Sequence, residues 1–225
     1  MTRKLLTLAF AALALGAVQA VEVKWEAGAI NAGSTDLPTS VSFGASSQSS
    51  WVASLTIPTV SDKTVLLAFG QEQNLPDGTY ANWNNSVRLE LSADGALNLI
   101  VRNGHQPGNA TLSLAAGLTA GKNHKIAIAF LRGANSDDPN SGDTTCTATV
   151  YLDGVAIGSV DAANAFNGPI NAVYSGANGI VTDLDVFSGL LTEAEGIAYS
   201  TIPEPTALAL LALGVAGVAL RRRVA

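Results

Sequence analysis

The sequence predicts an all-β protein, an antiparallel two-sheet jelly-roll sandwich with one short helix on its C-terminal side. Short apolar and β-branched runs recur between turn residues, and almost no segment keeps a helical period. Asp-Gly pairs, which favour tight hairpins, stand between such runs at 94–95 and 153–154. No repeat with a period of about 20 to 50 residues is visible, which disfavours solenoids and propellers. A β-barrel is the second choice.

Residues 1–20 have the pattern of a secretory signal peptide. A basic start precedes an apolar run over 5–17 and a small-residue cleavage site at 18–20. We therefore expect an N-terminal signal helix that is cleaved after Ala20. A retained N-terminal anchor is the alternative, although the apolar run is short for a membrane span.

Residues 21–201 are expected to form the sandwich. Its candidate strands are runs of apolar and β-branched residues bounded by turn residues. They are 21–26, 50–57, 63–70, 86–92, 96–102, 110–114, 123–132, 145–153, 155–160 and 179–187.

The alternation within the strands predicts their faces. In 87–91, apolar residues point one way, while Arg88 and Glu90 point the other. Asp94 and Gly95 are expected to supply the two positive-φ positions of the hairpin that follows. The strand 123–132 differs because both of its faces are apolar. It should be central in its sheet and covered on both sides.

A single segment, 192–198, predicts a helix inside the domain. Thr192 is a suitable N-cap, and Glu195 three residues later completes a capping box.

The C-terminal segment 202–225 predicts a membrane handle. The uncharged run 207–220 is followed by Arg221, Arg222 and Arg223, which the positive-inside preference would keep in the cytoplasm. As a transmembrane helix these residues would reach roughly 21 Å, short of a hydrocarbon core of about 30 Å. Pro203-Glu204-Pro205 ends the helix and leaves an accessible peptide at the outer interface.

The order of Pro203, Glu204 and Pro205, the apolar run and the Arg cluster resembles the PEP-CTERM sorting signal of Gram-negative bacteria. The resemblance implies export through the secretion machinery, recognition by an exosortase, which is a membrane-embedded transpeptidase, and removal of the tail. The chain would first be held in the inner membrane with its C-terminus cytoplasmic, and would end at the cell surface or in the extracellular matrix. An ordinary anchor that stays attached is the alternative.

The second half of the domain resembles concanavalin A-like lectin/glucanase domains of the LamG type. The resemblance is carried by an ordered set of segments: a His-containing strand at 123–130, a Tyr-Leu-Asp-Gly hairpin at 151–154, a closing strand at 179–187 and the helix start at 190–195. Lys122 and Asn123 stand where that family usually has a Trp. The resemblance implies a sandwich whose relatives include glycan binders, protein-binding modules and glycoside hydrolases.

Charge excludes one class of partner. Between the two terminal segments, seven Lys and Arg face 17 Asp and Glu, so the domain carries about ten net negative charges. Nucleic acid is therefore a poor partner. The single Cys146 cannot form an intramolecular disulfide. A buried, inert thiol is favoured over an intermolecular bridge or a reactive site.

No catalytic constellation stands out. A retaining glycosidase needs two carboxylates about 5 Å apart, and the nearest pairs are 183/185 on a strand and 193/195 at the start of the helix. His124 begins a predicted core strand and does not stand near a nucleophile motif, so a satisfied polar residue is favoured over a triad member. We expect no catalytic residue and no enzyme activity.

Two loops contain candidate binding residues. Carboxylates and an amide in 133–143 offer hard oxygen ligands to calcium, although a solvated acidic loop is the favoured alternative and no other cofactor is expected. Aromatic rings and amides in 80–85 could stack on a sugar and bind its hydroxyl groups, although packing on the sandwich is favoured. The candidate calcium ligands are Asp137, Asp138, Asn140 and Asp143, and the candidate ligand-binding residues are Tyr80, Asn82, Trp83 and Asn84. Trp25 and Trp51 are expected in the core.

Two function classes remain open. The first is an exported, non-catalytic module that binds glycan or protein in the cell envelope or exopolysaccharide matrix. The second is a structural surface or matrix protein without a specific ligand. A glycoside hydrolase is the least favoured alternative because the sequence lacks a recognisable carboxylate pair.

Overall fold

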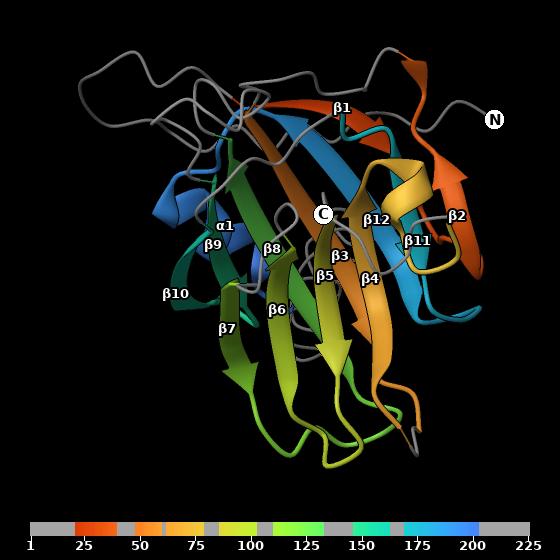
Figure 1. Ribbon diagram of the computed structural model, residues 1–225. Coiled ribbons are helices and arrows are strands. Elements are labelled where there is room, and N and C mark those ends of the chain that lie inside the picture. The colour runs from red at the N-terminus through yellow and green to blue at the C-terminus, as the bar shows by residue number, and fades with distance from the viewer. Residues whose placement is uncertain are drawn as a thin grey trace, which may run out of the picture.

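The computed structural model describes residues 21–39, 48–59, 62–78, 86–102, 110–132, 146–162 and 169–202. Within these residues two antiparallel six-stranded sheets pack face to face, and one α-helix lies near the C-terminal side (Figure 1). The predicted all-β sandwich with one short helix is confirmed. We call the two layers the back sheet and the front sheet.

The back sheet has the strand order β1-β12-β3-β8-β9-β10. Its longest pairing joins β3 to β8 without a register shift, from the pair Gln48 and Leu131 to the pair Thr56 and Asn123. The bounds are β1 (Glu22–Glu26), β12 (Val181–Ser188), β3 (Gln48–Thr56), β8 (Asn123–Leu131), β9 (Cys146–Leu152) and β10 (Val155–Ala162).

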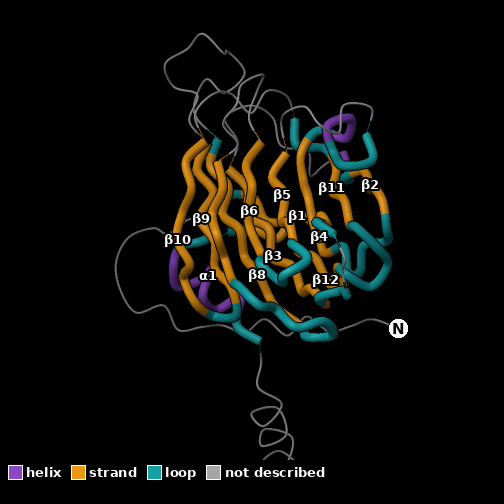
Figure 2. The backbone as a smooth tube through the Cα atoms, turned by 60° about the horizontal axis from the view of Figure 1, so that its bottom comes forward, coloured by secondary structure: helices purple, strands orange, loops and turns teal. Residues whose placement is uncertain are grey.

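The front sheet has the strand order β2-β11-β4-β5-β6-β7. The bounds are β2 (Gly33–Asp36), β11 (Ala172–Ser175), β4 (Thr64–Gly70), β5 (Ser86–Leu91), β6 (Leu97–Arg102) and β7 (Ala110–Ala115). A short 3-10 helix, η2 (Glu72–Asn74), follows β4. Figure 2 shows η2 and the α-helix near opposite ends of the sandwich.

Sequence patterning missed two strands, β2 and β11. Their sequences, Gly-Ser-Thr-Asp and Ala-Val-Tyr-Ser, are four residues long, and neither has a clear alternation of apolar and polar residues. They form because β11 pairs with β4 on one side and with β2 on the other, so ladder hydrogen bonds compensate for a weak local preference.

The core lies between the sheets. Trp51 of β3 stacks on Phe69 of β4 with 4.2 Å between ring centroids and 6° between ring planes, and Phe130 of β8 meets Phe69 edge-on at 6.0 Å. All three rings are buried, and the indole Nε1 of Trp51 donates to the hydroxyl of Ser49 at 3.0 Å. The predicted core position of Trp51 is confirmed, Trp25 packs against the same core, and Cys146 is buried within it.

The outer face of the back sheet is covered by the helix α1 (Glu193–Ser200). A second buried cluster fills the space beneath α1; it comprises Val52, Ala127, Tyr151, Phe187 and Leu191, with Val21 and Ile197 packed against it. The strand predicted over 123–132 is therefore central and covered on both faces, as expected. The capping box of Thr192 and Glu195 is also present.

The two Asp-Gly hairpins differ. Asp153 (φ 52°) and Gly154 (φ 79°) both adopt positive φ, as a two-residue hairpin requires. At the other hairpin only Gly95 (φ 81°) does, so the prediction for Asp94 was wrong. The amide of Gly95 donates to the carbonyl of Ser92, and the amide of Ser92 donates to the carbonyl of Ala96, which makes a three-residue loop with a glycine bulge.

Within the described ranges, no helix is long and apolar enough to cross a membrane. The predicted signal peptide 1–20 and the predicted transmembrane segment 207–220 lie outside those ranges.

We predict that Gly196→Ala loosens α1 from the back sheet. A Cβ atom at Gly196 would lie 2.3 Å from Cε2 of Tyr151, so either the helix or the buried ring must move. Alanine would otherwise stabilise a helix interior by about 0.5 to 1 kcal/mol, yet we expect a net loss of about 2 kcal/mol in the free energy of unfolding. Urea unfolding measures this value.

The double variant Gly196→Ala with Tyr151→Ala provides the control. If the clash is the cause, the glycine substitution costs nothing once the ring is gone. Equal costs with and without the ring would contradict the packing.

Candidate functional site

The site residues predicted from the sequence cannot be placed by the described structure. Outside the described residues lie the cleavage site at Ala20, the ligand-binding candidates Tyr80, Asn82, Trp83 and Asn84, the calcium candidates Asp137, Asp138, Asn140 and Asp143, and the sorting residues Pro203, Glu204, Pro205, Arg221, Arg222 and Arg223. Among the residues that are described, no group of three or more His, Cys, Asp or Glu could hold a metal ion.

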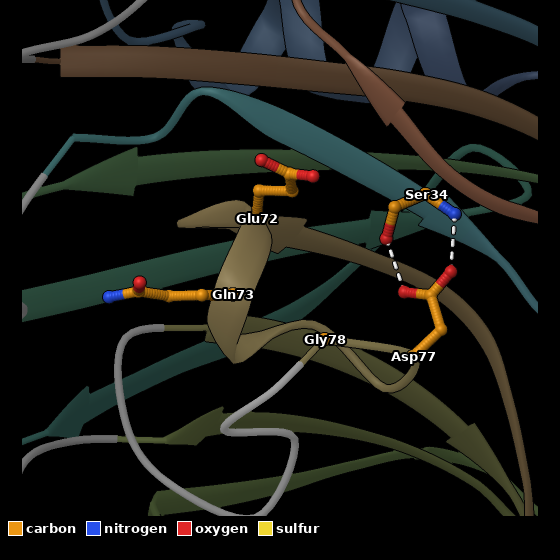
Figure 3. A pocket seen from close by; sticks show the side chains of 5 residues that line it. All are labelled: Ser34, Glu72, Gln73, Asp77 and Gly78. Atoms are coloured by element: carbon orange, nitrogen blue, oxygen red, sulfur yellow. Dashed lines mark hydrogen bonds between the residues drawn. The ribbon is translucent and has the colours of Figure 1, made fainter.

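A cavity of about 310 Å³ opens on the outer face of the front sheet. Figure 3 shows the residues that line it: Ser34 of β2, Glu72 and Gln73 of η2, and Asp77 and Gly78 of the turn after η2. We call it the front pocket. The front pocket lies where the segment 71–78 crosses the sheet. The contacts that hold this segment therefore determine the shape of the pocket.

Arg88 of β5 fastens η2 to the sheet. Its side chain is 4% exposed, its Nη2 donates to the carbonyl of Asn74 at 2.7 Å, and its Nε donates to the hydroxyl of Ser86 at 2.8 Å. The sequence placed this arginine on the face opposite the core, and that face is correct. It is buried there because η2 and the turn cover it.

Other contacts hold the two ends of the segment. At its start, the amide of Glu72 donates to the side-chain Oδ1 of Asn171 at 2.9 Å. In the middle, Leu75 is buried against Ala68 and Ala172 on the outer face of the sheet. The backbone of the pocket is therefore held in place before any ligand arrives.

At its far end the segment is tied to β2. The amide of Ser34 donates to Oδ2 of Asp77 at 2.7 Å, and the Ser34 hydroxyl donates to Oδ1 of the same carboxylate (Figure 3). The turn also needs a glycine, because a Cβ atom at Gly78 would lie 2.5 Å from the backbone carbon and oxygen of Gln73.

Tyr174 adds an aromatic ring beside this pair. It is the register partner of Ser34 and packs on the outer-face cluster around Ala68. Burial raises the pKa of its hydroxyl above the usual value of 10, the Asp77 carboxylate raises it further, and Arg88 lowers it. The ring, the carboxylate and the guanidinium therefore share one environment.

The groups free to meet a ligand are those of Glu72 and Gln73. Both side chains are exposed, and within the described residues their carboxylate and amide form no hydrogen bond. A carboxylate accepts and a primary amide both donates and accepts. Such groups can bind the hydroxyl groups of a sugar. The ring of Tyr174 lies on the same face of the sheet but does not line the pocket.

A second cavity, of about 230 Å³, lies at the other end of the sandwich and contains His124. Its lining residues are Ser54, Asn123, His124, Lys125, Thr182 and Ile202. Nδ1 of His124 lies 2.6 Å from Oδ2 of Asp153, so His124 is a satisfied polar residue, as predicted. Within the described residues no hydrogen bond joins the Ser54 hydroxyl to His124, so this cavity has no nucleophile–base contact.

The carboxylate pairs weighed from the sequence have other surroundings. Glu195 accepts hydrogen bonds from the amide and hydroxyl of Thr192 within the capping box. Burial raises the pKa of Asp185 to about 6, with the carboxylates of Asp183 and Glu26 adding to the rise and Lys125 opposing it. The raised pKa therefore results mainly from the loss of solvent around the Asp185 carboxylate on the outer face of the back sheet.

Comparison with known proteins identifies the C-terminal segment. Residues 201–223 match the PEP-CTERM protein-sorting motif, which indicates an exported protein and implies processing by an exosortase. No curated protein sequence matches the chain.

The fold resembles sialidase domains in solved structures. The CBM40 domain of the Ruminococcus gnavus IT-sialidase, bound to α2,3-sialyllactose, has a TM-score of 0.53 and 16% identity over 80% of this chain and 100% of its own. A leech intramolecular trans-sialidase has a TM-score of 0.54 and 15% identity over 80% of this chain and 28% of its own. A mutant of the NanB sialidase of Streptococcus pneumoniae has a TM-score of 0.51, 15% identity and the same coverage. At these identities the likeness shows the fold, and the LamG-type assignment stays a prediction.

Sequence reasoning missed the front pocket for identifiable reasons. The sequence pattern pointed to the aromatic rings and amides of 80–85, whereas the described pocket ends at Gly78. The Asp77-Gly78 pair signalled a turn, but nothing local signalled that Asp77 would bind Ser34. That contact requires β2, which the patterning did not find.

We predict that Gly78→Ala disrupts the front pocket. The new Cβ atom cannot be accommodated without moving the backbone of Gln73, and we expect a loss of about 1 to 3 kcal/mol in the free energy of unfolding. Thermal and urea unfolding measure it. Gln73→Ala is the control, because it keeps the contacted backbone and removes only an exposed side chain. An unchanged stability of Gly78→Ala would contradict the close approach.

We also predict that Asp185 makes the protein more stable as the pH falls from about 7 to 4. Its folded-state pKa of about 6 exceeds the unfolded value of about 3.9, so the folded state binds the proton more tightly. The stabilisation is complete below about pH 4 and is lost as the pH rises through about 6. Because Asp185 is only half-buried, we expect an effect on the order of 1 kcal/mol.

Asp185→Asn isolates this effect. The variant should be more stable than the native chain at pH 7 and should lose the advantage near pH 4. Parallel curves of unfolding free energy against pH for the two proteins would contradict the assignment.

Proposed function

We propose that this protein is an exported, non-catalytic carbohydrate-binding module that acts in the cell envelope or exopolysaccharide matrix of a Gram-negative bacterium. The front pocket is its binding site. The observation that carries the proposal is a rigidly held polar pocket with exposed hydrogen-bonding groups, on the same outer face of a lectin-like sandwich as the ring of Tyr174.

The comparisons support this class of function. The Ruminococcus gnavus domain is a carbohydrate-binding module bound to sialyllactose, and this chain covers its whole length. The fold alone does not determine function. The pocket adds the hydrogen-bonding groups that such binding requires. Arg88, which lies in the same sheet, holds the segment that forms the pocket.

The sorting motif supports the delivery part of the proposal. The signal peptide would be cleaved after Ala20, the segment 207–220 would hold the chain in the inner membrane, and an exosortase would remove the tail. In support, the domain ends immediately before the motif: the amide of Gly154 donates to the hydroxyl of Ser200 at the end of α1, three residues before Pro203. The sorting motif therefore begins directly after a docked helix.

A glycan array probed with the full chain tests the proposal. We expect binding to a defined set of glycans, and a weakening of about tenfold in Glu72→Ala and in Gln73→Ala, because each removes one or two hydrogen bonds. The exposed Glu193→Ala on α1 is the matched control and should bind normally. Trp83→Ala tests the contact predicted from the sequence.

The alternatives give different results. A purely structural surface or matrix protein would bind no glycan, and a protein-binding module would bind an envelope protein instead. Binding that is unaffected in both pocket variants would place the site elsewhere. Release of reducing ends from a polysaccharide would show a glycoside hydrolase.

A further inference from the structure

The front pocket is lined by acidic groups. Glu72 and Asp77 both line it, and the exposed carboxylate of Glu72 is uncompensated within the described residues. The Asp77 carboxylate accepts two hydrogen bonds from Ser34, a neutral residue that adds no positive charge. A ligand in the pocket therefore meets two carboxylates.

Within the described residues the lining contains no Lys, Arg or His. The nearest cation identified on this face is Arg88, whose buried guanidinium donates to neutral groups, the carbonyl of Asn74 and the hydroxyl of Ser86. Its single positive charge offsets the two carboxylates only in part, so a net negative charge remains. His124 and Lys125 line the other cavity. The domain carries about ten net negative charges, and these add a weak long-range repulsion of anions.

A bound metal ion explains the pocket less well. Both oxygens of Asp77 already accept hydrogen bonds, which leaves Glu72 as the one unengaged carboxylate of the lining. Divalent calcium takes six to eight oxygen ligands, and the described residues contain no group of three candidate ligands.

We propose that the front pocket selects its sugar by charge and takes an amino sugar, whose ammonium group pairs with Glu72 while the nearby charge of Asp77 adds to the attraction. Uncharged sugars bind less tightly, and acidic sugars such as sialic acid are disfavoured. This rests on the proposed function. It separates the chain from the domain whose fold it shares, because that domain binds a sialylated glycan.

The expected size follows from solvent exposure. An ion pair between exposed charges raises the binding affinity by up to about fivefold. Two nearby carboxylates should raise the affinity for the amine by about tenfold at low salt. The Debye length falls to about 8 Å at 0.15 M ionic strength, so added salt should reduce the preference.

Isothermal titration of the full chain with matched sugars tests the proposal. One pair is a glucosamine oligomer and the same oligomer fully N-acetylated, which differ in the ammonium charge. The other is lactose and α2,3-sialyllactose, which differ by one sialic acid residue and its carboxylate. We expect the charged amine to bind about tenfold more tightly than its acetylated form, and lactose to bind at least as tightly as sialyllactose.

Glu72→Gln keeps the shape and removes one charge, so it should shrink the preference for the amine severalfold. Glu193→Gln, which removes a charge from α1, should leave the preference unchanged. Equal affinities for the amine and its acetylated form, tighter binding of sialyllactose than of lactose, or an unchanged preference in Glu72→Gln would overturn the charge selection. A complete absence of glycan binding on the array would instead overturn the proposed function, and this inference with it.

Discussion

The stacking of Trp51 on Phe69 is the contact on which the rest of the structure depends. It joins the middle of the back sheet to the middle of the front sheet, and Phe130 closes it from the side. Because these rings are buried and the indole N–H is satisfied within the protein, the two layers have one favourable separation and register. The inner face of each sheet packs into this core. The outer faces do not take part in it, so their residues can differ between the two sheets.

The two outer faces are treated differently. The back sheet is apolar on its outside around Val52 and Ala127, so it needs the cover that α1 provides. The front sheet has Arg88 on its outside instead, which cannot be buried without hydrogen-bond partners. The segment 71–78 supplies one of them through the carbonyl of Asn74. It covers the face incompletely, and the front pocket is the space that remains beside it. The front pocket is therefore a consequence of covering a charged face with a turn where the other face has a helix.

Much of this fold could be predicted from the sequence, because the long strands carry their pattern locally. Three local patterns are enough to predict the elements that contain them: the alternation in 87–91, the all-apolar run 126–131 and the capping box at Thr192. The structure contains all three elements. The missed strands, β2 and β11, owe their existence to the neighbouring strand edges, which no local pattern reveals. The front pocket could not be predicted for the same reason: its tie between Ser34 and Asp77 spans 43 residues and depends on a missed strand. The turn at Asp94 could not be predicted in detail either, because an Asp-Gly pair fits both a two-residue hairpin and a three-residue loop.

The front pocket and Ile202, the last described residue before Pro203, lie at opposite ends of the sandwich. The pocket lies beyond Gly70, where β4 ends, whereas Ile202 lies beside Asn123, where β8 begins. Because the strands run antiparallel and β4 begins where β3 ends, these are opposite ends of the sandwich, as the placement of η2 and α1 in Figure 2 also shows. A chain held in a membrane by its tail would therefore carry the pocket at the end away from that membrane. Ligand binding and processing of the tail would then not compete for space, so the module could engage its ligand before or after the tail is removed.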